Sequence, residues 1–237
     1  MKEIDIVNIC ESVLSSLATM GYESNKVESV GQLIFPVKNG GQDRISEQEL
    51  RQLFIEEFKD KHEDLCYSIE TPTIGKFKFG EKFEDISSGK GRSASLDMCI
   101  YKRDKNTIIR DLNIEFKFNN VSLYKIGKDI LKLMKEEQNG VFILLLNNTD
   151  RGTLCNIGHT GVLDKLSQSF NRFKDNWQGN KSIQLVIISL QEKVFIHRTI
   201  TDTLFENEKT VFSICENSYV NMSEINEDSG WEIVRVK

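Results

Sequence analysis

Apolar positions recur at helical spacing near the start of the chain. Residues 3–20 follow this pattern and predict an amphipathic helix. The segment 21–44 is predicted to be irregular, because a proline and a glycine pair interrupt its short apolar stretch. A second helix is predicted at 47–61, with Ser46 as its N-cap and Glu49 in the capping-box position three residues later.

Beyond this helix, short apolar runs alternate with further helical patterns. Alternation of apolar and polar residues is typical of half-buried strands, whereas a continuous apolar run indicates a strand buried on both faces. The expected elements are, in order, a strand at 65–74, a glycine-rich loop at 80–92, strands at 93–101 and 107–118 joined by a turn at 102–106, a helix at 122–138, a strand at 141–148, a helix at 163–177, a strand at 182–190 and an edge strand at 193–200.

This order of elements predicts an α/β fold. Antiparallel strands followed by helical crossovers imply a mixed central β-sheet flanked by helices on both faces. We expect the core at residues 44–200, an N-terminal helix and irregular segment packing on it at 1–43, and a C-terminal extension of peripheral strands or loops at 201–237. The length of 237 residues suits one domain with such additions.

Composition narrows the class of protein. Charged residues make up 28% and hydrophobic residues 39%, which allows a sizeable globular core. The five cysteines are scattered without a CxxC pair, which favours reduced thiols over disulfides or a zinc site. Neither a secretory signal nor a membrane-spanning run is evident, so we expect a soluble cytoplasmic protein with no membrane partner. The net charge of −5 argues mildly against nucleic-acid binding, unless positive charge gathers locally.

Three charged residues interrupt the apolar runs of two neighbouring predicted strands. Asp97 lies in "SLDMCIY", and Glu115 and Lys117 flank a phenylalanine in "NIEFKF". Charges are costly inside strands unless they are paired or bind something. Because side chains alternate along a strand, Glu115 and Lys117 project to one side, and Ile114 and Phe116 project to the other.

If the two strands pair as a hairpin, two carboxylates and an ammonium group meet on the sheet. Carboxylates held together repel one another and gain from a divalent cation. Magnesium suits such a site, because it takes few protein carboxylates and fills its other positions with water and substrate phosphates. The lysine can orient a metal-bound water and stabilise the charge that develops when this water attacks phosphorus. The three residues therefore supply the parts for phosphodiester hydrolysis.

Acid-x-Lys tripeptides are also common in charged proteins. A second copy, Glu57-Phe58-Lys59, lies in a predicted helix with no aspartate-bearing strand before it, so we set it aside. For the first copy, a surface salt bridge between Glu115 and Lys117 is the alternative. The order of an Asp strand, a turn, a Glu-x-Lys strand and a helix favours the catalytic interpretation.

Residues 44–200 resemble the PD-(D/E)XK nuclease superfamily, which includes many restriction endonucleases and Holliday-junction resolvases. The resemblance lies in the order of elements and in the Asp97…Glu115-x-Lys117 motif, with Leu96 in place of the motif's proline. It implies that Asp97, Glu115 and the backbone carbonyl of Phe116 bind Mg²⁺, for which Mn²⁺ can substitute. It further implies that Lys117 assists the attacking water.

The superfamily frequently adds an acidic residue on the first helix of the core. Glu47, Glu49, Glu56 and Glu57 are the candidates. At 100° per residue, Glu47 falls on the flank of the buried stripe, whereas Glu49 and Glu56 point away and Glu57 lies deep in the helix. We therefore select Glu47 as a catalytic residue, with Glu49 as the reserve. A first-turn glutamate also suits the helix dipole without any catalytic role.

Two groups of lysine and arginine residues follow the helix at 47–61 in the sequence. Lys125, Lys128, Lys132 and Lys135 are expected on the helix face opposite its apolar stripe, where they could contact phosphates or simply face solvent. Lys90 and Arg92 stand in the loop before the Asp97 strand. The nucleic-acid-binding residues that we expect are Lys90, Arg92, Lys125, Lys128 and Lys132.

The sequence thus predicts a Mg²⁺-dependent endonuclease that acts on DNA, of the restriction or defence type. A ribonuclease shares the same chemistry and remains an alternative. A different class, a catalytically silent nuclease-fold protein that binds a protein partner, is favoured by the acidic charge. Restriction-type enzymes commonly work as dimers, so the N-terminal helix could form a homodimer interface or pack on its own domain.

Overall fold

The structure is a computed structural model in which residues 4–19, 33–38, 42–43, 45–147, 149, 153–154, 161–207, 212, 222, 225 and 229–236 are described. Among these residues, none of the helices combines the length and the apolar character needed to cross a membrane.

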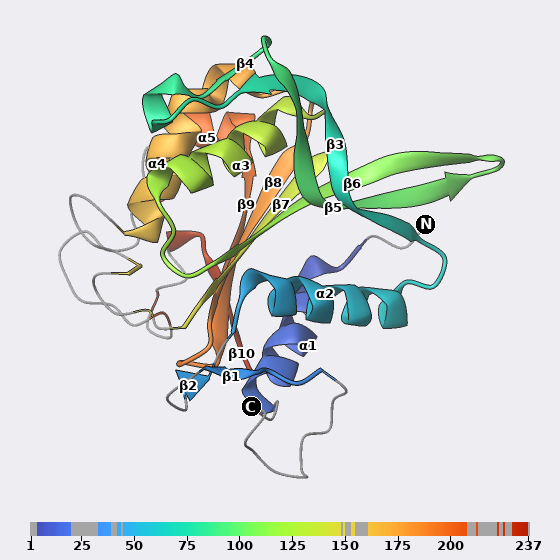
Figure 1. Ribbon diagram of the computed structural model, residues 1–237, viewed down its shortest axis with the longest axis vertical. Helices are drawn as coiled ribbons and strands as arrows, with labels where there is room; N and C mark the ends of the chain where they lie inside the picture. Colours follow the sequence, from blue (N-terminus) through green and yellow to red (C-terminus); the bar gives the residue numbers. More distant parts are fainter. Residues whose placement is uncertain are drawn as a thin grey trace.

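A mixed sheet of eight strands runs through the described part of the chain, as predicted (Figure 1). Neighbouring strands follow the order β10-β9-β8-β7-β6-β5-β3-β4. Strand β7 pairs in parallel with β6 and with β8, and the other neighbours are antiparallel. The strands are β3 (Cys66–Lys78), β4 (Ser87–Ser88), β5 (Arg92–Asp104), β6 (Thr107–Phe118), β7 (Asn139–Leu146), β8 (Ser182–Ser189), β9 (Val194–Thr201) and β10 (Glu232–Arg235).

Helices cover both faces of this sheet, α1 and α2 on one face and α3 and α4 on the other (Figure 1). Serine hydroxyls cap two of them: Ser46 accepts from the amide of Gln48 at the start of α2, and Ser122 accepts from the amide of Lys125 at the start of α3. The helices are α1 (Ile6–Thr19), α2 (Glu47–Lys61), α3 (Leu123–Lys135), α4 (Val162–Phe173) and α5 (Asp202–Asn207), with 3-10 turns η1 (Phe83–Asp85) and η2 (Lys174–Asn176).

The central strand β7 is buried on both faces, which explains its continuous apolar run. Phe142 and Leu144 belong to the core under α3 and α4, whereas Val141 and Ile143 belong to the core under α1 and α2. The apolar face of α1 is buried in this second core. Of the two roles considered for this helix, the structure therefore shows packing on its own domain.

Several predicted boundaries need correction. The segment 193–200 is not an edge strand, because β10 pairs with β9 on its outer side. The turn predicted at 102–106 is shorter, because β5 continues to Asp104 and β6 begins at Thr107. The loop predicted at 80–92 contains η1 and β4. The segment 21–44 includes a small antiparallel pair, β1 (Val37–Lys38) with β2 (Gln42–Asp43), and its other residues lie largely outside the described part.

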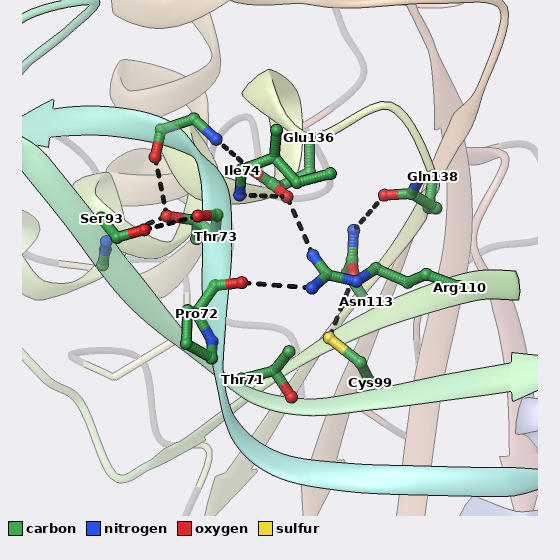
Figure 2. A network of polar contacts seen from close by, with 12 residues as sticks. Thr71, Pro72, Thr73, Ile74, Ser93, Cys99, Arg110, Asn113, Glu136 and Gln138 are labelled. Carbon is green, nitrogen blue, oxygen red and sulfur yellow. Dashed lines mark hydrogen bonds and ion pairs between the residues drawn. The ribbon is translucent and has the colours of Figure 1, made fainter. Parts of the chain in front are cut away.

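A buried carboxylate fixes the end of α3 to strand β3 (Figure 2). Glu136 follows the last helical residue, and its side chain accepts hydrogen bonds from the amides of Ile74 and Gly75 at 3.0 and 2.8 Å. Arg110 of β6 donates to the same carboxylate at 3.0 Å and to the carbonyl of Pro72 at 3.1 Å. These contacts hold β3 where its register with β5 shifts between Pro72 and Lys76.

The alanine substitution of Glu136 should destabilise the protein strongly. It leaves the Arg110 guanidinium without its buried partner, and breaking such a pair from one side costs about 3–5 kcal/mol. The free energy of unfolding in urea measures this loss. Glu137→Ala, which removes the same charge at an exposed neighbour, should change it by less than about 0.5 kcal/mol. A loss below about 1 kcal/mol for Glu136→Ala would contradict the role given to this carboxylate.

Candidate active site

The expected catalytic residues come from three elements that meet at the sheet. Asp97 lies on β5, Glu115 and Lys117 lie on β6, and Glu47 is the first residue of α2. Ile114 and the phenylalanine between Glu115 and Lys117 are buried in the core under α2, as the alternation along the strand predicts. Glu115 and Lys117 are therefore turned to the opposite face, where α3 packs.

Asp97 is joined to the Glu-x-Lys strand by a backbone contact. Its Oδ2 atom accepts a hydrogen bond from the amide of Phe116 at 2.8 Å. Phe116 stands between the other two residues of the motif, so this bond sets Asp97 beside both of them. The antiparallel pairing of β5 with β6, in which Met98 stands opposite Ile114, brings these positions together.

The ammonium group of Lys117 lies at the centre of the site. Its Nζ atom is 3.0 Å from Asp129, 3.6 Å from Glu47 and 3.9 Å from Asp97. The same nitrogen donates to the carbonyl of Phe116 at 2.6 Å. The acid selected on the first helix thus joins the motif, whereas Glu49 bonds to the N-cap hydroxyl of Ser46. Three groups expected in the site, the carboxyl groups of Glu47 and Asp97 and the carbonyl of Phe116, therefore lie around the Lys117 ammonium group. Glu115 lies two positions before this lysine on the same strand.

Two residues of α3 complete the cluster, and sequence reasoning missed their role in it. The Nζ atom of Lys132 lies 2.6 Å from Glu115, 2.9 Å from Asp129 and 2.9 Å from the carbonyl of Ser95. Asp129 thereby contacts both lysines. An acid inside the apolar stripe of α3, next to Ile130, was the signal that could have revealed it.

This placement corrects the expectation for Lys132. Its residue is only 7% exposed, and its ammonium group points into the site, so it does not belong to a solvent-facing stripe that contacts phosphates. Lys90, Arg92 and Lys125 are exposed. Lys128 is half-buried, with its ammonium group over the rings of Phe79 and Tyr124, at 5.4 and 4.8 Å from their centroids.

Burial and mutual repulsion shift the acids of the cluster. Burial raises the pKa of Glu115 well above its ordinary value, and Lys132 only partly offsets the effect. Burial also raises the pKa of Glu47, where Lys117 acts in the opposite direction and Asp97 adds to the increase. Asp129 behaves differently, because its two lysine partners outweigh burial and lower its pKa.

The two lysines are held in their charged form. Burial on its own would lower the pKa of Lys117, but Asp129 and Asp97 outweigh it and the pKa is raised. The pKa of Lys132 is raised in the same way, by Asp129 and Glu115 against the effect of burial. Both groups are therefore ammonium ions at neutral pH, and neither is a general base.

Acidic side chains outnumber ammonium groups in this cluster. The carboxyl groups of Glu47, Asp97, Glu115 and Asp129 face two ammonium groups. Within the described residues, both carboxylate oxygens of Glu115 are buried and lack a hydrogen bond of good geometry, although Lys132 lies close to one of them. Such buried oxygens are stabilised by a further cation.

The donor set fits a hard cation, but the cluster is not a ready-made cage. Carboxylate and carbonyl oxygens are the ligands that Mg²⁺ prefers. In the described part of the chain, however, no three His, Cys, Asp or Glu side chains form a group that could hold a metal ion. The ammonium groups of Lys117 and Lys132 lie against the carboxylates and against the Phe116 carbonyl. Asp97, Glu115 and this carbonyl are the groups that would hold the ion.

Comparison with known proteins found no matching family model, no matching curated protein and no matching solved structure. The geometry and charge of the cluster are therefore the features of this chain that bear on its function.

The raised pKa of Glu115 predicts a pH dependence of stability in metal-free buffer with a chelator. The folded chain keeps the proton of Glu115 to a higher pH than the unfolded chain, whose value is near 4.5. The contribution of this residue is thus fully present below pH 4.5 and is lost as the pH rises through the folded-state value. Relative to Glu115→Gln, the wild type should lose stability from about pH 5 towards neutrality.

Urea unfolding of both proteins at a series of pH values measures this difference. Glu63→Gln changes an exposed glutamate and serves as the control, whose curve should run parallel to the wild type. If the stability curves of Glu115→Gln and the wild type ran parallel, the pKa of Glu115 would not be raised in the folded protein.

Proposed function

We propose that this protein is a Mg²⁺-dependent nuclease that hydrolyses phosphodiester bonds, with DNA as its substrate. One observation carries the proposal: Glu47, Asp97 and Asp129 surround the Lys117 ammonium group, and Glu115 lies beside them with buried carboxylate oxygens. The mixed sheet and the resemblance to the PD-(D/E)XK superfamily support the same assignment. Acidic groups thus outnumber the ammonium groups at the place where this chemistry needs a divalent ion.

The chain's own residues have distinct tasks in this proposal. Mg²⁺, when bound, supplies Lewis-acid stabilisation and an activated water. Asp97 and Glu115 hold the ion, with the Phe116 carbonyl that Lys117 now contacts. Lys117, kept positively charged by its acidic neighbours, orients the attacking water and stabilises the negative charge that grows on the phosphoryl oxygens.

Glu47 stands at the outer side of the same cluster. Its side chain is 35% exposed, more than those of the other acids, so it can reach water as well as Lys117. Burial and Asp97 raise its pKa, which makes this carboxylate a stronger base towards an attacking water. We assign the general base to Glu47 and the electrostatic role to Lys117. RNA carries the same phosphodiester group, so a ribonuclease would use these residues in the same way.

A second candidate function is a catalytically silent protein of the same fold that binds a protein partner. The observation that favours it is the pairing of both lysines with the acids, which leaves no ready-made metal group in the described residues. In that case the ion pairs serve only to stabilise the fold. The two candidates differ in their response to divalent ions.

Removing a metal ligand or the central lysine should abolish cleavage. Asp97→Asn and Lys117→Ala should each reduce the rate at which the protein cleaves its DNA substrate, single-stranded or plasmid, in Mg²⁺ or Mn²⁺ by roughly 100-fold or more, because the water is then neither held nor activated. Gel analysis of labelled single-stranded DNA, plasmid and labelled RNA measures the rates, and circular dichroism checks folding. Lys59→Ala, an exposed lysine of α2, should cleave like the wild type. Unchanged cleavage by either site variant, or no cleavage by the wild type on any substrate, would exclude the proposed function.

Binding of the ion should also be measurable without catalysis. A ligand that binds only the folded state stabilises it by about 2.7 kcal/mol at 100 times its dissociation constant. For a domain of this size, such a gain raises the melting temperature by roughly 5–10 °C. Thermal melts in Mg²⁺ and in chelator should show this rise for the wild type and a much smaller one for Asp97→Asn. Equal rises in the melting temperature of both proteins would show that the ion binds at another site.

A further inference from the structure

A pocket of about 570 Å³ opens directly beside the acid cluster. Asp129 and Lys132, both members of the cluster, line its inner part. Phe77 near the end of β3 and Phe79 just beyond this strand line the pocket, as does the segment 91–95, which includes the start of β5. The pocket thus lies between α3 and the β3–β5 pair, and it is continuous with the site of the proposed reaction.

Positive charge is concentrated around this pocket, although the chain as a whole carries −5. Lys78, Arg92, Lys128 and Lys132 line it, against the single carboxylate of Asp129. Lys132 is already engaged with Glu115 and Asp129. The other three cations are exposed or half-buried, and they form a cationic rim around the pocket. Asp129 is the acidic residue of the lining.

Aromatic residues form one wall of the pocket and hold one of these cations. The rings of Phe77 and Phe79 are stacked, with centroids 5.7 Å apart and planes 16° apart. Lys128 lies over the other end of this stack, at 5.4 Å from the centroid of Phe79. Its ammonium group is therefore kept at the pocket by cation–π attraction instead of extending into solvent.

Backbone packing brings Arg92 to the same rim. Gly91 has a φ of +117°, and a Cβ atom there would lie 2.1 Å from the Phe77 carbonyl oxygen. Only glycine allows β5 to begin this close to β3. The close approach sets Arg92 opposite Phe77 in the sheet, so the guanidinium is presented beside the aromatic wall.

We propose that this pocket binds an unpaired nucleotide next to the bond that is cut, so that the substrate is single-stranded nucleic acid. The inference rests on the proposed nuclease function and specifies its substrate. A cationic rim matches phosphates, and an aromatic wall gives a base an apolar surface whatever its identity, which is how single strands are bound without sequence preference. The volume falls in the range of pockets that enclose a small molecule. A continuous duplex must first unpair and unstack a base before it can place one in such a pocket, whereas a single strand offers its bases without this cost.

Binding in chelator tests this inference without any cleavage. Labelled single-stranded DNA and RNA of mixed sequence and a blunt DNA duplex of the same length are titrated with the full-length protein, and fluorescence anisotropy gives the dissociation constants. At least one single strand should bind roughly tenfold or more tightly than the duplex. Whether DNA or RNA binds more tightly identifies the sugar that the site prefers.

Two pocket variants and a matched control complete the experiment. Arg92→Ala and Lys128→Ala should each weaken single-strand binding by roughly tenfold, and each should reduce the slope of log affinity against log salt by about 0.7. Lys59→Ala removes the same charge from α2, on the other face of the sheet, and should leave binding unchanged. Circular dichroism confirms that all variants fold.

Each other outcome overturns the inference. It fails if the duplex binds as tightly as the single strand with the higher affinity, if no single strand binds, or if the pocket variants behave like Lys59→Ala. These failures differ from failure of the proposed function. If the wild type cuts duplex plasmid in Mg²⁺ but shows no preference for single strands, the proposed nuclease function stands and the proposed nucleotide pocket is rejected. If the wild type binds single strands through the pocket but never cuts them, the proposed nuclease function is rejected.

Discussion

One buried carboxylate, that of Asp129, holds the two ammonium groups on which the site depends. Its oxygens lie 3.0 Å from Lys117 and 2.9 Å from Lys132. An unpaired charge in this position would be costly, because a protein interior solvates ions poorly. The ion pairs also fix geometry. Lys132 reaches across to Glu115 on β6, and Lys117 reaches across to Glu47 on α2, so helices on both faces are linked to the same strand.

Helix α3 is the element that aligns these groups, and two contacts anchor its C-terminal end. The Lys181 ammonium group donates to the carbonyls of Leu133 and Met134 in the last turn. A cation there satisfies carbonyls that have no partner within the helix and complements the helix dipole. Next to it, Glu136 ties the helix to β3 through Ile74 and Gly75. Both anchors follow directly after Lys132, so they fix the end of the helix that carries this lysine and Asp129.

The sequence predicted the longer helices and strands of the core, their order and the mixed sheet, because apolar periodicity is a local property of the chain, whereas the short elements β1, β2, β4, α5 and β10 were not predicted individually. The buried face of α1 could be predicted for the same reason, and so could the N-cap at Ser46. Glu47, Asp97, Glu115 and Lys117 were found because each interrupts or flanks an apolar pattern. The geometry then brought all four into one neighbourhood.

What could not be predicted depends on contacts between distant segments. The prediction for Lys132 required that one side of α3 faces water. The helix instead packs so that this lysine reaches Glu115, seventeen positions earlier in the chain. The pairing of β9 with β10 likewise joins segments that no local pattern relates. The pocket beside the cluster arises from a close backbone approach at Gly91, for which a glycine-rich loop is only a weak indication.

The contacts of Glu136 have a consequence for how this molecule meets its neighbours in solution. Strand β4 covers only Phe77 and Lys78 of the outer side of β3, so much of that long strand has no further strand beside it in the described structure. Open strand edges invite pairing between molecules and aggregation. Here Pro72 has no amide hydrogen to offer, and the amides of Ile74 and Gly75 are already bound to the carboxylate. The same side chain that anchors α3 therefore also removes two backbone donors from this part of the strand edge.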